Sequence, residues 1–319
     1  MDLSQVTLTQ MRYAVAIAET GGFRQAAERS FVSQSGLSMQ IRKLEELLGV
    51  QLFDRSRRPV LATHEGEAAL AQMRTILRET ERLGQVVADQ GELAGPYRLG
   101  VIPSLASSVL PLFLRAFVER HPKVELTIEE LMTHDILARL QEDRLDAGIA
   151  ATPLDTPGIT EVPLGYEPFL AYLPPGDALL DKDMVEDADL QQCELWIMPE
   201  GHCFRSQVLS LCRAGRRGQH ANVNFESGSF ETLTRLVDDG LGATVLPALV
   251  VDRLPPSRRS AQVRPLGPTP PMREIGLVTS RSDLRRRIND ALAELVRERL
   301  ADALGPVPRD GRVLDPLAS

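Results

Sequence analysis

Residues 31–49 read FVSQSGLSMQIRKLEELLG and have the pattern of one amphipathic helix with a defined start and end. Ser33 carries a side chain suited to an N-cap, and Gly49 is a residue type that commonly ends helices. Between them, apolar residues recur at the spacing of one helix face. These residues are Leu37, Ile41, Leu44 and Leu48. The stretch therefore predicts a helix that buries one face and exposes the other.

The exposed face of this predicted helix is small, polar and basic. Small side chains let a helix enter the DNA major groove, and glutamine and arginine can hydrogen-bond to base edges. A shorter helical stretch, 23–30, precedes it across a tight turn, as in a helix-turn-helix. The candidate base-contacting residues are Gln34, Ser35, Ser38 and Arg42. From spacing alone, an amphipathic helix with a solvated polar face explains the pattern equally well.

Charge is unevenly distributed along the chain. The whole sequence has a formal net charge of −8, but residues 1–60 hold eight Arg or Lys against six Asp or Glu, which gives +2 and leaves −10 for the rest. DNA phosphates require only a local basic surface and not a basic chain. The asymmetry therefore permits a small DNA-binding module on an acidic body.

A longer run of matches surrounds the predicted helix. They are the paired Ala26 and Ala27 and the strings VSQS, LS, QI, LE, LG, LFDR and T-x-x-G. With them, residues 24–70 resemble the winged helix-turn-helix of the LysR-type transcriptional regulators. The resemblance implies that the stretch DRSRRPVLAT forms the wing and that its arginines contact phosphates or the minor groove. These arginines are Arg55, Arg57 and Arg58.

Two glycines depart from the family pattern. Gly22 stands where the family commonly has serine, and Gly36 lies in the first turn of the predicted recognition helix. A glycine there should cost about 0.5 to 1 kcal/mol relative to alanine. Neither glycine replaces a candidate base-contacting side chain.

Residues 64–90 contain no proline and carry a short heptad-like seam. The seam positions are Ala69, Met73, Ile76, Thr80, Leu83 and Val87. Their alternating steps of four and three residues predict a helix that pairs with a second copy of the chain. A single helix packed on its own domain is the alternative. We assign 1–62 to the DNA-binding domain and 63–92 to a linker, or dimerisation, helix.

Strand-like and helix-like stretches alternate from residue 97 onward, beginning with YRLGVI and LPLFLRAFVERHP. Such alternation predicts right-handed crossovers and a parallel sheet. Two α/β lobes joined by crossing strands resemble the periplasmic-binding-protein-like effector domain of LysR regulators, whose ligand lies between the lobes. We expect lobe I at 93–165 and 269–302, and lobe II at 166–268. Residues 303–319 hold three Pro and two Gly and are predicted to be a disordered tail.

Three cysteines occur in the chain, and two of them lie nine positions apart in GHCFRSQVLSLC, residues 201–212. Cys203 follows a glycine-containing turn at the predicted start of a helix, close to Arg205. The helix dipole and the cation should lower the pKa of its thiol, and hydrogen peroxide oxidises a thiolate to a sulfenic acid. Cys212 could then condense with it. Nine helical residues span about 13.5 Å, whereas a disulfide needs Cα atoms about 4.4 to 6.8 Å apart, so the helix would have to unwind.

From spacing alone, two structural cysteines remain the more common explanation. A metal site built from His202, Cys203 and Cys212 matches no standard zinc spacing, and we predict neither a metal nor another cofactor. The segment GHCFRSQ followed by Cys212 nevertheless resembles the redox segment of the peroxide-sensing members of the LysR family. Further matches, such as LMTHDILARL and PMREIGLV, extend over nearly the whole chain.

This second resemblance implies roles for particular residues. Cys203 would be the peroxidatic cysteine and Cys212 the resolving one. The peroxide pocket would be formed by Ser104, Thr133, His202, Arg205 and Arg273. Ser104 stands where relatives often have threonine, and Ser206 stands where an acidic residue commonly follows the arginine. Cys193 has no counterpart in the resemblance and is expected to be a structural thiol.

The predicted fold class is α/β, with an all-α N-terminal winged helix-turn-helix, a long linker helix and a two-lobed redox-sensing regulatory domain at 93–302. We expect a homodimer or homotetramer that binds paired half-sites in double-stranded DNA, contacts RNA polymerase and responds to hydrogen peroxide. Its targets would be peroxide-defence genes, such as those for catalase and alkyl hydroperoxide reductase, which it would activate or repress. It would be a stoichiometric sensor and not an enzyme. The chain has no signal-peptide pattern and no uninterrupted apolar span, so a cytoplasmic location away from membranes is expected.

Two other functions fit the same sequence. A LysR-type regulator could respond to a small-molecule effector between the lobes, and activity that survives Cys203→Ser would favour it. A thiol peroxidase could carry an appended DNA-binding module, and consumption of far more than one equivalent of peroxide per chain would favour that function.

Overall fold

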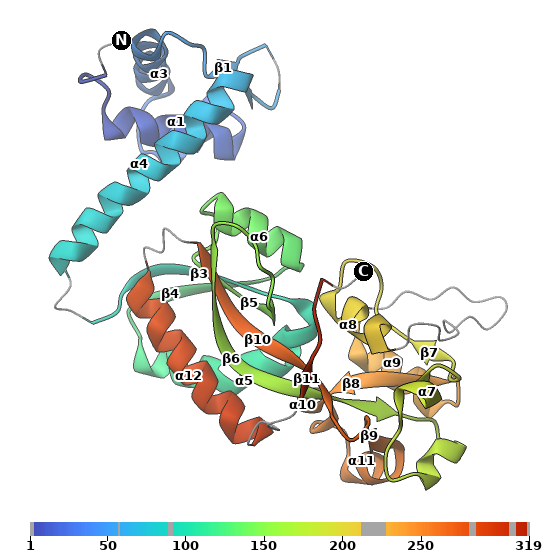
Figure 1. Cartoon of the computed structure of the whole chain (residues 1–319). Helices are drawn as coiled ribbons and strands as arrows, with labels where there is room; N and C mark the ends of the chain where they lie inside the picture. Colours follow the sequence, from blue (N-terminus) through green and yellow to red (C-terminus); the bar gives the residue numbers. More distant parts are fainter. Residues whose placement is uncertain are drawn as a thin grey trace. The chain divides into compact units, whose positions relative to one another are not determined.

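The chain forms two compact units, residues 1–91 and 92–319, and each unit has its own hydrophobic core (Figure 1). The computed structural model describes residues 3–56, 58–88, 92–211, 228–280, 285–305 and 311–317, with their side chains except those of 78 and 81–88. Arg57 and Cys212 lie outside the described residues.

The N-terminal unit is a winged helix-turn-helix followed by a long helix. Its elements are α1 (Leu8–Thr20), α2 (Phe23–Arg29), α3 (Gln34–Leu48), β1 (Phe53–Asp54), β2 (Leu61–Ala62) and α4 (His64–Ala88). The helix predicted after Ser33 is confirmed as α3. The Ser33 hydroxyl accepts the Gly36 N–H at 3.1 Å, and Gly49 ends the helix in the left-handed region at φ 70°. The two wing strands pair antiparallel.

The first turns of α4 complete the core of this unit. Leu70 and Met73 are 2% and 4% exposed, and they belong to the same apolar cluster as the buried face of α3. Gly66 permits this packing, because a Cβ there would lie 2.1 Å from the carbonyl oxygen of Leu52. The start of α4 is therefore packed on its own domain, as in the alternative interpretation of the seam. The side chains of Leu83 and Val87, further along the predicted seam, lie outside the described part of the structure.

The C-terminal unit is a mixed α/β structure. Its strands are β3 (Gly95–Val101), β4 (Val124–Glu130), β5 (Ala147–Thr152), β6 (Ile159–Tyr172), β7 (Leu195–Trp196), β8 (Ala243–Pro247), β9 (Val263–Pro265), β10 (Pro271–Ser280) and β11 (Arg312–Val313). Its helices are α5 (Pro103–Arg120), α6 (Thr133–Gln141), the 3₁₀ helix η1 (Ala178–Asp181), α7 (Asp187–Leu190), α8 (Cys203–Leu211), α9 (Phe230–Asp238), α10 (Ala248–Val251), α11 (Pro256–Gln262) and α12 (Arg286–Leu304).

The sheet of this unit runs in the order β4-β3-β5-β10-β6-β8-β7, with β9 on β6 and β11 on β10. As predicted, β3 pairs parallel with both β4 and β5. The expectation of a parallel sheet fails for β10, which runs antiparallel to both β5 and β6, and for β6, which runs antiparallel to β8. The long strands β6 and β10 thus carry the chain from one half of the unit to the other and back (Figure 1).

Two hydrophobic clusters define the two lobes. The lobe I cluster includes Val101, Phe113, Ile149 and Leu292, contributed by β3, α5, β5 and α12. The lobe II cluster includes Phe169, Trp196, Val208 and Val245, contributed by β6, β7, α8 and β8. This arrangement confirms the predicted fold class, with a helical N-terminal module and a two-lobed C-terminal unit.

The prediction that residues 303–319 are disordered is wrong for much of this segment. Helix α12 extends to Leu304, and Arg312 and Val313 form β11, which pairs parallel with the start of β10. Leu314 is 6% exposed and lies in the lobe II cluster. Proline and glycine content suggested disorder, but the hydrogen bonds that order the segment come from a strand about 40 residues away in sequence, which composition does not reveal.

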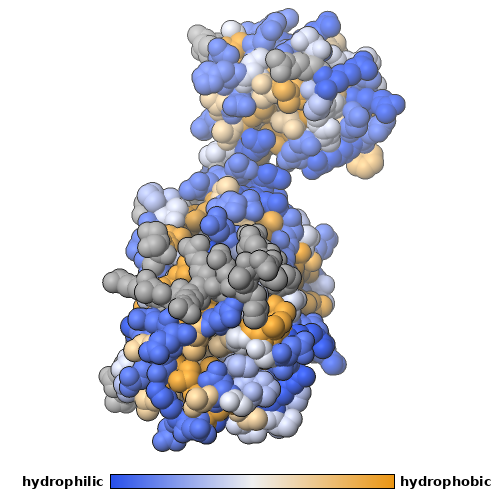
Figure 2. All heavy atoms as spheres, turned by 90° about the vertical axis from the view of Figure 1, so that its right-hand side faces the viewer, coloured by the Kyte–Doolittle hydropathy of each residue, from blue (hydrophilic) through white to orange (hydrophobic). Residues whose placement is uncertain are grey.

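The face of the molecule that Figure 2 shows is largely polar. On the face shown in Figure 2, hydrophilic residues cover most of each unit, and hydrophobic residues are visible only in small groups. Among the described helices, none combines the length and the apolar character needed to cross a bilayer.

Candidate functional site

The side chain of Cys203 lies where the two lobes meet. Cys203 is the first residue of α8, reached from β7 through a turn in which Gly201 has φ 90°. Its side chain is 8% exposed and belongs to the lobe I cluster. The next residue, Phe204, belongs to the lobe II cluster. Consecutive residues at the start of α8 therefore pack into different lobes.

A fully buried cation lies near this thiol. Arg273 on β10 is 0% exposed, and its charge acts on Cys203 while its guanidinium lies 5.8 Å from the ring centroid of Phe204. It donates to Glu167 Oε2 at 2.8 Å from Nε and at 2.7 Å from Nη2. It also donates to Ser104 Oγ at 3.0 Å and to the Ser104 carbonyl at 3.1 Å. The other carboxylate oxygen of Glu167, Oε1, accepts the Leu249 N–H at 2.8 Å. Both carboxylate oxygens of this buried ion pair therefore have hydrogen-bond donors.

Burial dominates the acidity of the Cys203 thiol. It raises the pKa of the thiol, and the nearby charge of Arg273, the Thr133 hydroxyl and the backbone N–H groups of Phe204 and Cys203 only partly offset it. The expectation of a lowered pKa is therefore wrong for this conformation. The helix N-terminus acts in the expected direction, but the loss of hydration of the thiolate outweighs it.

The cation near the thiol is also a different one from that expected. Arg205, placed in the peroxide pocket from the sequence, donates from Nη1 to the carbonyl of Met198 at 2.9 Å. At about 100° per residue, a side chain two positions further along a helix lies nearly opposite the first. Arg273, which is 70 residues away in sequence, supplies the positive charge instead.

Two further residues of the predicted pocket are buried polar groups. Thr133, the first residue of α6, is 7% exposed, and its hydroxyl interacts with Cys203 and lowers the pKa of the thiol. Within the described part of the chain, Thr133 Oγ1 has no partner with conventional hydrogen-bond geometry. His202 is also 7% exposed, and burial lowers the pKa of its imidazole despite the opposing charge of Glu130, so it is neutral at pH 7.

Interactions connect four of the predicted pocket residues, from Ser104 through Arg273 to Cys203 and Thr133. These four residues and His202 are all buried. Glu167, which holds Arg273, was missed in the sequence analysis. An acid in the middle of the otherwise apolar strand LGYEPFLAY was a signal for a buried charge that requires a partner.

We expect oxidation of Cys203 by excess hydrogen peroxide to become about tenfold faster per pH unit between about pH 6 and pH 8, because only the thiolate reacts. The pKa of this thiol is raised, so its thiolate fraction still increases with pH throughout that range. Stopped-flow kinetics over a pH series will measure the slope. A rate that is already constant above pH 6 would contradict the prediction, because it would require a lowered pKa.

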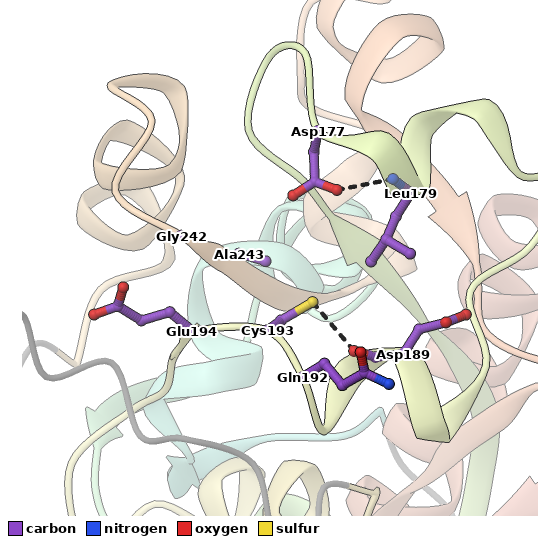
Figure 3. A pocket seen from close by; sticks show the side chains of 8 residues that line it. All are labelled: Asp177, Leu179, Asp189, Gln192, Cys193, Glu194, Gly242 and Ala243. Atoms are coloured by element: carbon purple, nitrogen blue, oxygen red, sulfur yellow. Dashed lines mark hydrogen bonds between the residues drawn. The ribbon is translucent and has the colours of Figure 1, made fainter.

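Cys193 is a different kind of thiol. It is half-buried before β7, beside a pocket of about 340 Å³ that is also lined by Asp177 and Asp189 (Figure 3). Its Sγ donates to the carbonyl of Asp189 at 3.4 Å. Burial, followed by the charges of Asp177 and Asp189, raises its pKa to about 11. Two carboxylates disfavour the thiolate of Cys193, whereas the charge of Arg273 favours that of Cys203. Cys193 is therefore expected to be the less reactive thiol near neutral pH.

We therefore expect Cys193 to stay reduced in the native protein after treatment with hydrogen peroxide. At pH 7.5 only about one thiol in a few thousand is ionised when the pKa is about 11. Differential alkylation followed by peptide mass spectrometry will measure its oxidation, with the unfolded chain as the reactive control. Oxidation of Cys193 as rapid as that of Cys203 would contradict this assignment.

The predicted DNA-contacting residues are largely accessible on α3 and the wing. Gln34, Ser35 and Arg42 are exposed and Ser38 is half-buried. Arg58 is exposed in the wing. Arg55 instead donates to Glu45 Oε2 at 2.7 Å and lies over the ring of Phe23 at 4.9 Å, so it is engaged within the unit itself.

Two exposed apolar residues near this surface were missed. Phe31, in the turn before α3, is 95% exposed with φ 54°, and Met39 on α3 is 64% exposed. Apolar side chains at such a surface can contact the methyl group of thymine. The amphipathic pattern gave no reason to single them out.

We expect Arg42→Ala to weaken binding to a preferred DNA duplex by about 1 to 3 kcal/mol, the usual contribution of a side chain that reads a base. Fluorescence anisotropy at fixed salt, with a duplex selected for binding to the wild type, will measure the loss. Arg115→Ala is a matched control, because Arg115 is a highly exposed arginine on α5 of the other unit. An equal loss on unselected DNA would instead assign Arg42 to a phosphate.

Comparisons with known proteins agree with both units. Residues 8–67 match the model of the lysR-family bacterial regulatory helix-turn-helix protein, and residues 90–301 match that of the LysR substrate binding domain. The chain is 37% identical to the DNA-binding transcriptional dual regulator OxyR of Escherichia coli, over 92% of this chain and 96% of the relative. It is 36% identical to the probable hydrogen peroxide-inducible genes activator of Mycobacterium leprae, over 92% and 95%.

Solved structures show the same similarity. A full-length OxyR variant from Pseudomonas aeruginosa matches with a TM-score of 0.77 and 33% identity, over 92% of this chain and 95% of that one. A cysteine variant of Corynebacterium glutamicum OxyR with bound hydrogen peroxide matches with a TM-score of 0.60 and 29% identity, over 95% of both chains. The chain therefore belongs to the LysR family of bacterial helix-turn-helix regulators and, within that family, to the OxyR group.

Proposed function

We propose that this protein is a DNA-binding transcription regulator that senses hydrogen peroxide through Cys203. The observation that carries the proposal is the environment of the thiol. It is buried between two lobes, next to Arg273 and to the Thr133 hydroxyl, which has no conventional partner among the described residues. Relatives over nearly the whole chain bear the name of hydrogen peroxide-inducible genes activators. A buried thiol beside a hydroxyl that lacks a conventional hydrogen-bond partner suits a small polar oxidant.

The proposed chemistry balances with one peroxide and two thiols. The Cys203 thiolate attacks one peroxide oxygen and the O–O bond breaks, which leaves a sulfenic acid on sulfur and a hydroxide that takes up a proton as water. The Cys212 thiol then attacks the oxidised sulfur, an S–S bond forms and a second water leaves. The proton that the Cys203 thiol loses is the one that the hydroxide takes up, and Arg273 stabilises the thiolate in between. One peroxide is consumed per disulfide, and the reaction stops there unless a reductant restores the thiols, so a sensor consumes about one equivalent per chain.

The helical conformation of α8 is incompatible with this disulfide. From Cys203 to Leu211 the chain is helical, which separates these residues by about 12 Å along the axis, and Cys212 follows Leu211 directly in sequence. A disulfide needs Cα atoms about 4.4 to 6.8 Å apart. Formation of the bond therefore requires α8 to unwind, which withdraws the Cys203 side chain from the lobe I cluster.

The consequence we propose is a change in how copies of the chain assemble on DNA. A homodimer or homotetramer presents several copies of α3 to successive half-sites of double-stranded DNA. Altered lobe packing would change their spacing, the contact with RNA polymerase and the expression of peroxide-defence genes. This process would take place in the cytoplasm, where reduced thiols are the resting state.

The test is a peptide map of the full-length protein after addition of one equivalent of hydrogen peroxide, with thiols trapped in acid before digestion. A rapid disulfide between Cys203 and Cys212 is expected. An unreacted Cys203 would overturn the proposal and favour a regulator with a small-molecule effector. Continued peroxide consumption with a thiol reductant, far above one equivalent per chain, would overturn the sensor role in favour of a peroxidase.

A further inference from the structure

The C-terminal segment, residues 311–317, contacts α8, the helix that begins at Cys203. β11 pairs with the start of β10 near the crossing between the lobes, and Leu314, the residue after β11, contacts α8 (Figure 1). Two backbone bonds hold the segment to the body of the protein, from Arg312 N to the Pro270 carbonyl at 3.1 Å and from Leu314 N to the Met272 carbonyl at 2.8 Å. An exposed ion pair between Arg312 and Asp187 of α7 adds a weaker contact at 3.0 Å.

One hydrogen bond and a shared apolar cluster link this segment to α8. Gln207, in the middle of α8, is 0% exposed and donates from Nε2 to the carbonyl of Leu314 at 3.0 Å. The Leu314 side chain is 6% exposed and belongs to the same apolar cluster as Val208 and Leu211 of α8. One tail residue thus contributes both a backbone acceptor and a buried side chain to the region around the helix.

These contacts depend on α8 being helical. Gln207 lies midway between Cys203 and Leu211, so it belongs to the turns that must unwind before Cys203 can reach Cys212. An unwound segment cannot keep the Gln207 side chain and the apolar face of α8 in their present positions. The bond to Leu314 and the burial of its side chain are therefore available to the reduced conformation and not to the disulfide form.

We propose that residues 311–315 act as a latch that holds α8 in its reduced conformation, so that disulfide formation requires release of the C-terminal segment. This inference rests on the proposed function, in which Cys203 is oxidised. The latch shifts the redox equilibrium toward the reduced form, because its contacts stabilise only that form. It also protects α8 from transient unwinding, which is the motion that the disulfide requires.

The first test compares the full chain with a variant that lacks residues 311–319. In the reduced state, backbone amides of α8 are expected to exchange with deuterium about tenfold faster in the truncated chain, while those of α5 and α12 exchange as in the wild type. Titration against a thiol–disulfide buffer is expected to show an equilibrium about tenfold more in favour of the disulfide, which is a midpoint more negative by about 30 mV.

Point variants separate the latch from a general effect of truncation. Leu314→Asp is expected to reproduce both effects, because it places a charge in the lobe II cluster. Leu317→Asp is the matched control and is expected to have none, since Leu317 is 55% exposed in the same segment. Gln207→Met removes the donor and should shift the equilibrium in the full chain, but not further in the truncated one.

The outcomes distinguish the two proposals. Unchanged α8 exchange and an unchanged midpoint in the truncated chain would overturn the latch, as would equal effects of Leu314→Asp and Leu317→Asp. An additive effect of Gln207→Met in the truncated chain would also overturn it. If the wild type forms no disulfide with peroxide, the proposed function fails, and the exchange measurement still decides whether the segment holds α8.

Discussion

Arg273→Leu is expected to destabilise the regulatory unit by about 3 to 5 kcal/mol, because it leaves the carboxylate of Glu167 buried without its counter-ion. Both side chains are 0% exposed, and Arg273 makes every ionic contact that Glu167 has among the described residues. The variant also loses the cation that lowers the pKa of Cys203. Oxidation at pH 7 is therefore expected to be slower even in the molecules that remain folded.

Denaturant unfolding of the full chain will measure this effect. Trp196 is the only tryptophan of the protein and is 4% exposed in β7, so its fluorescence reports on the regulatory unit. Arg235→Ala is a suitable control, since Arg235 pairs with Glu231 on the surface and is 70% exposed. A loss below about 1 kcal/mol for Arg273→Leu would mean that the pair is not a buried ion pair in solution.

Cys203→Ser is expected to abolish the peroxide-dependent disulfide and the change in DNA binding that depends on it. A serine hydroxyl is not ionised at neutral pH and is not oxidised by peroxide, whereas the thiolate of Cys203 is. The substitution conserves size, and the Thr133 hydroxyl is available as a hydrogen-bond partner for the new one. The variant should therefore fold and remain in its reduced form.

Thiol trapping and DNA footprinting with and without peroxide will test this variant. Cys193→Ser is the matched control and should behave as the wild type, because the pKa of Cys193 is raised to about 11. A peroxide response that persists in Cys203→Ser would place the sensing chemistry elsewhere in the chain. A response lost in both variants would show that Cys193 also takes part.

The sequence predicts well those features that depend on interactions between residues close together in the chain. The start and end of α3 follow from Ser33 and Gly49, which bond to or shape the adjacent backbone. The position of Cys203 at the start of α8 follows from the preceding glycine-containing turn. In each case, the interaction that fixes the structure spans only a few residues.

The features that escaped prediction depend on contacts between distant segments. The raised pKa of Cys203 comes from its burial against lobe I, whose strands begin about 100 residues earlier. The family resemblance placed Arg273 in the pocket, but neighbouring residues pointed to Arg205 as the cation beside the thiol. Glu167 becomes visible as the partner of Arg273 only when β6 and β10 are paired. The ordered C-terminal segment likewise depends on β10 and α8.

The path of the chain through the two lobes has a consequence for biosynthesis. Lobe I contains β3 to β5, but its sheet and core also need β10 and α12, which are translated after nearly all of lobe II. Domains commonly fold in the order in which they leave the ribosome. Lobe I is therefore incomplete, with one edge of β5 unpaired, until most of lobe II has been synthesised. Nascent chains that stall within lobe II would expose that edge, which makes the interval before β10 emerges the period of greatest risk for aggregation.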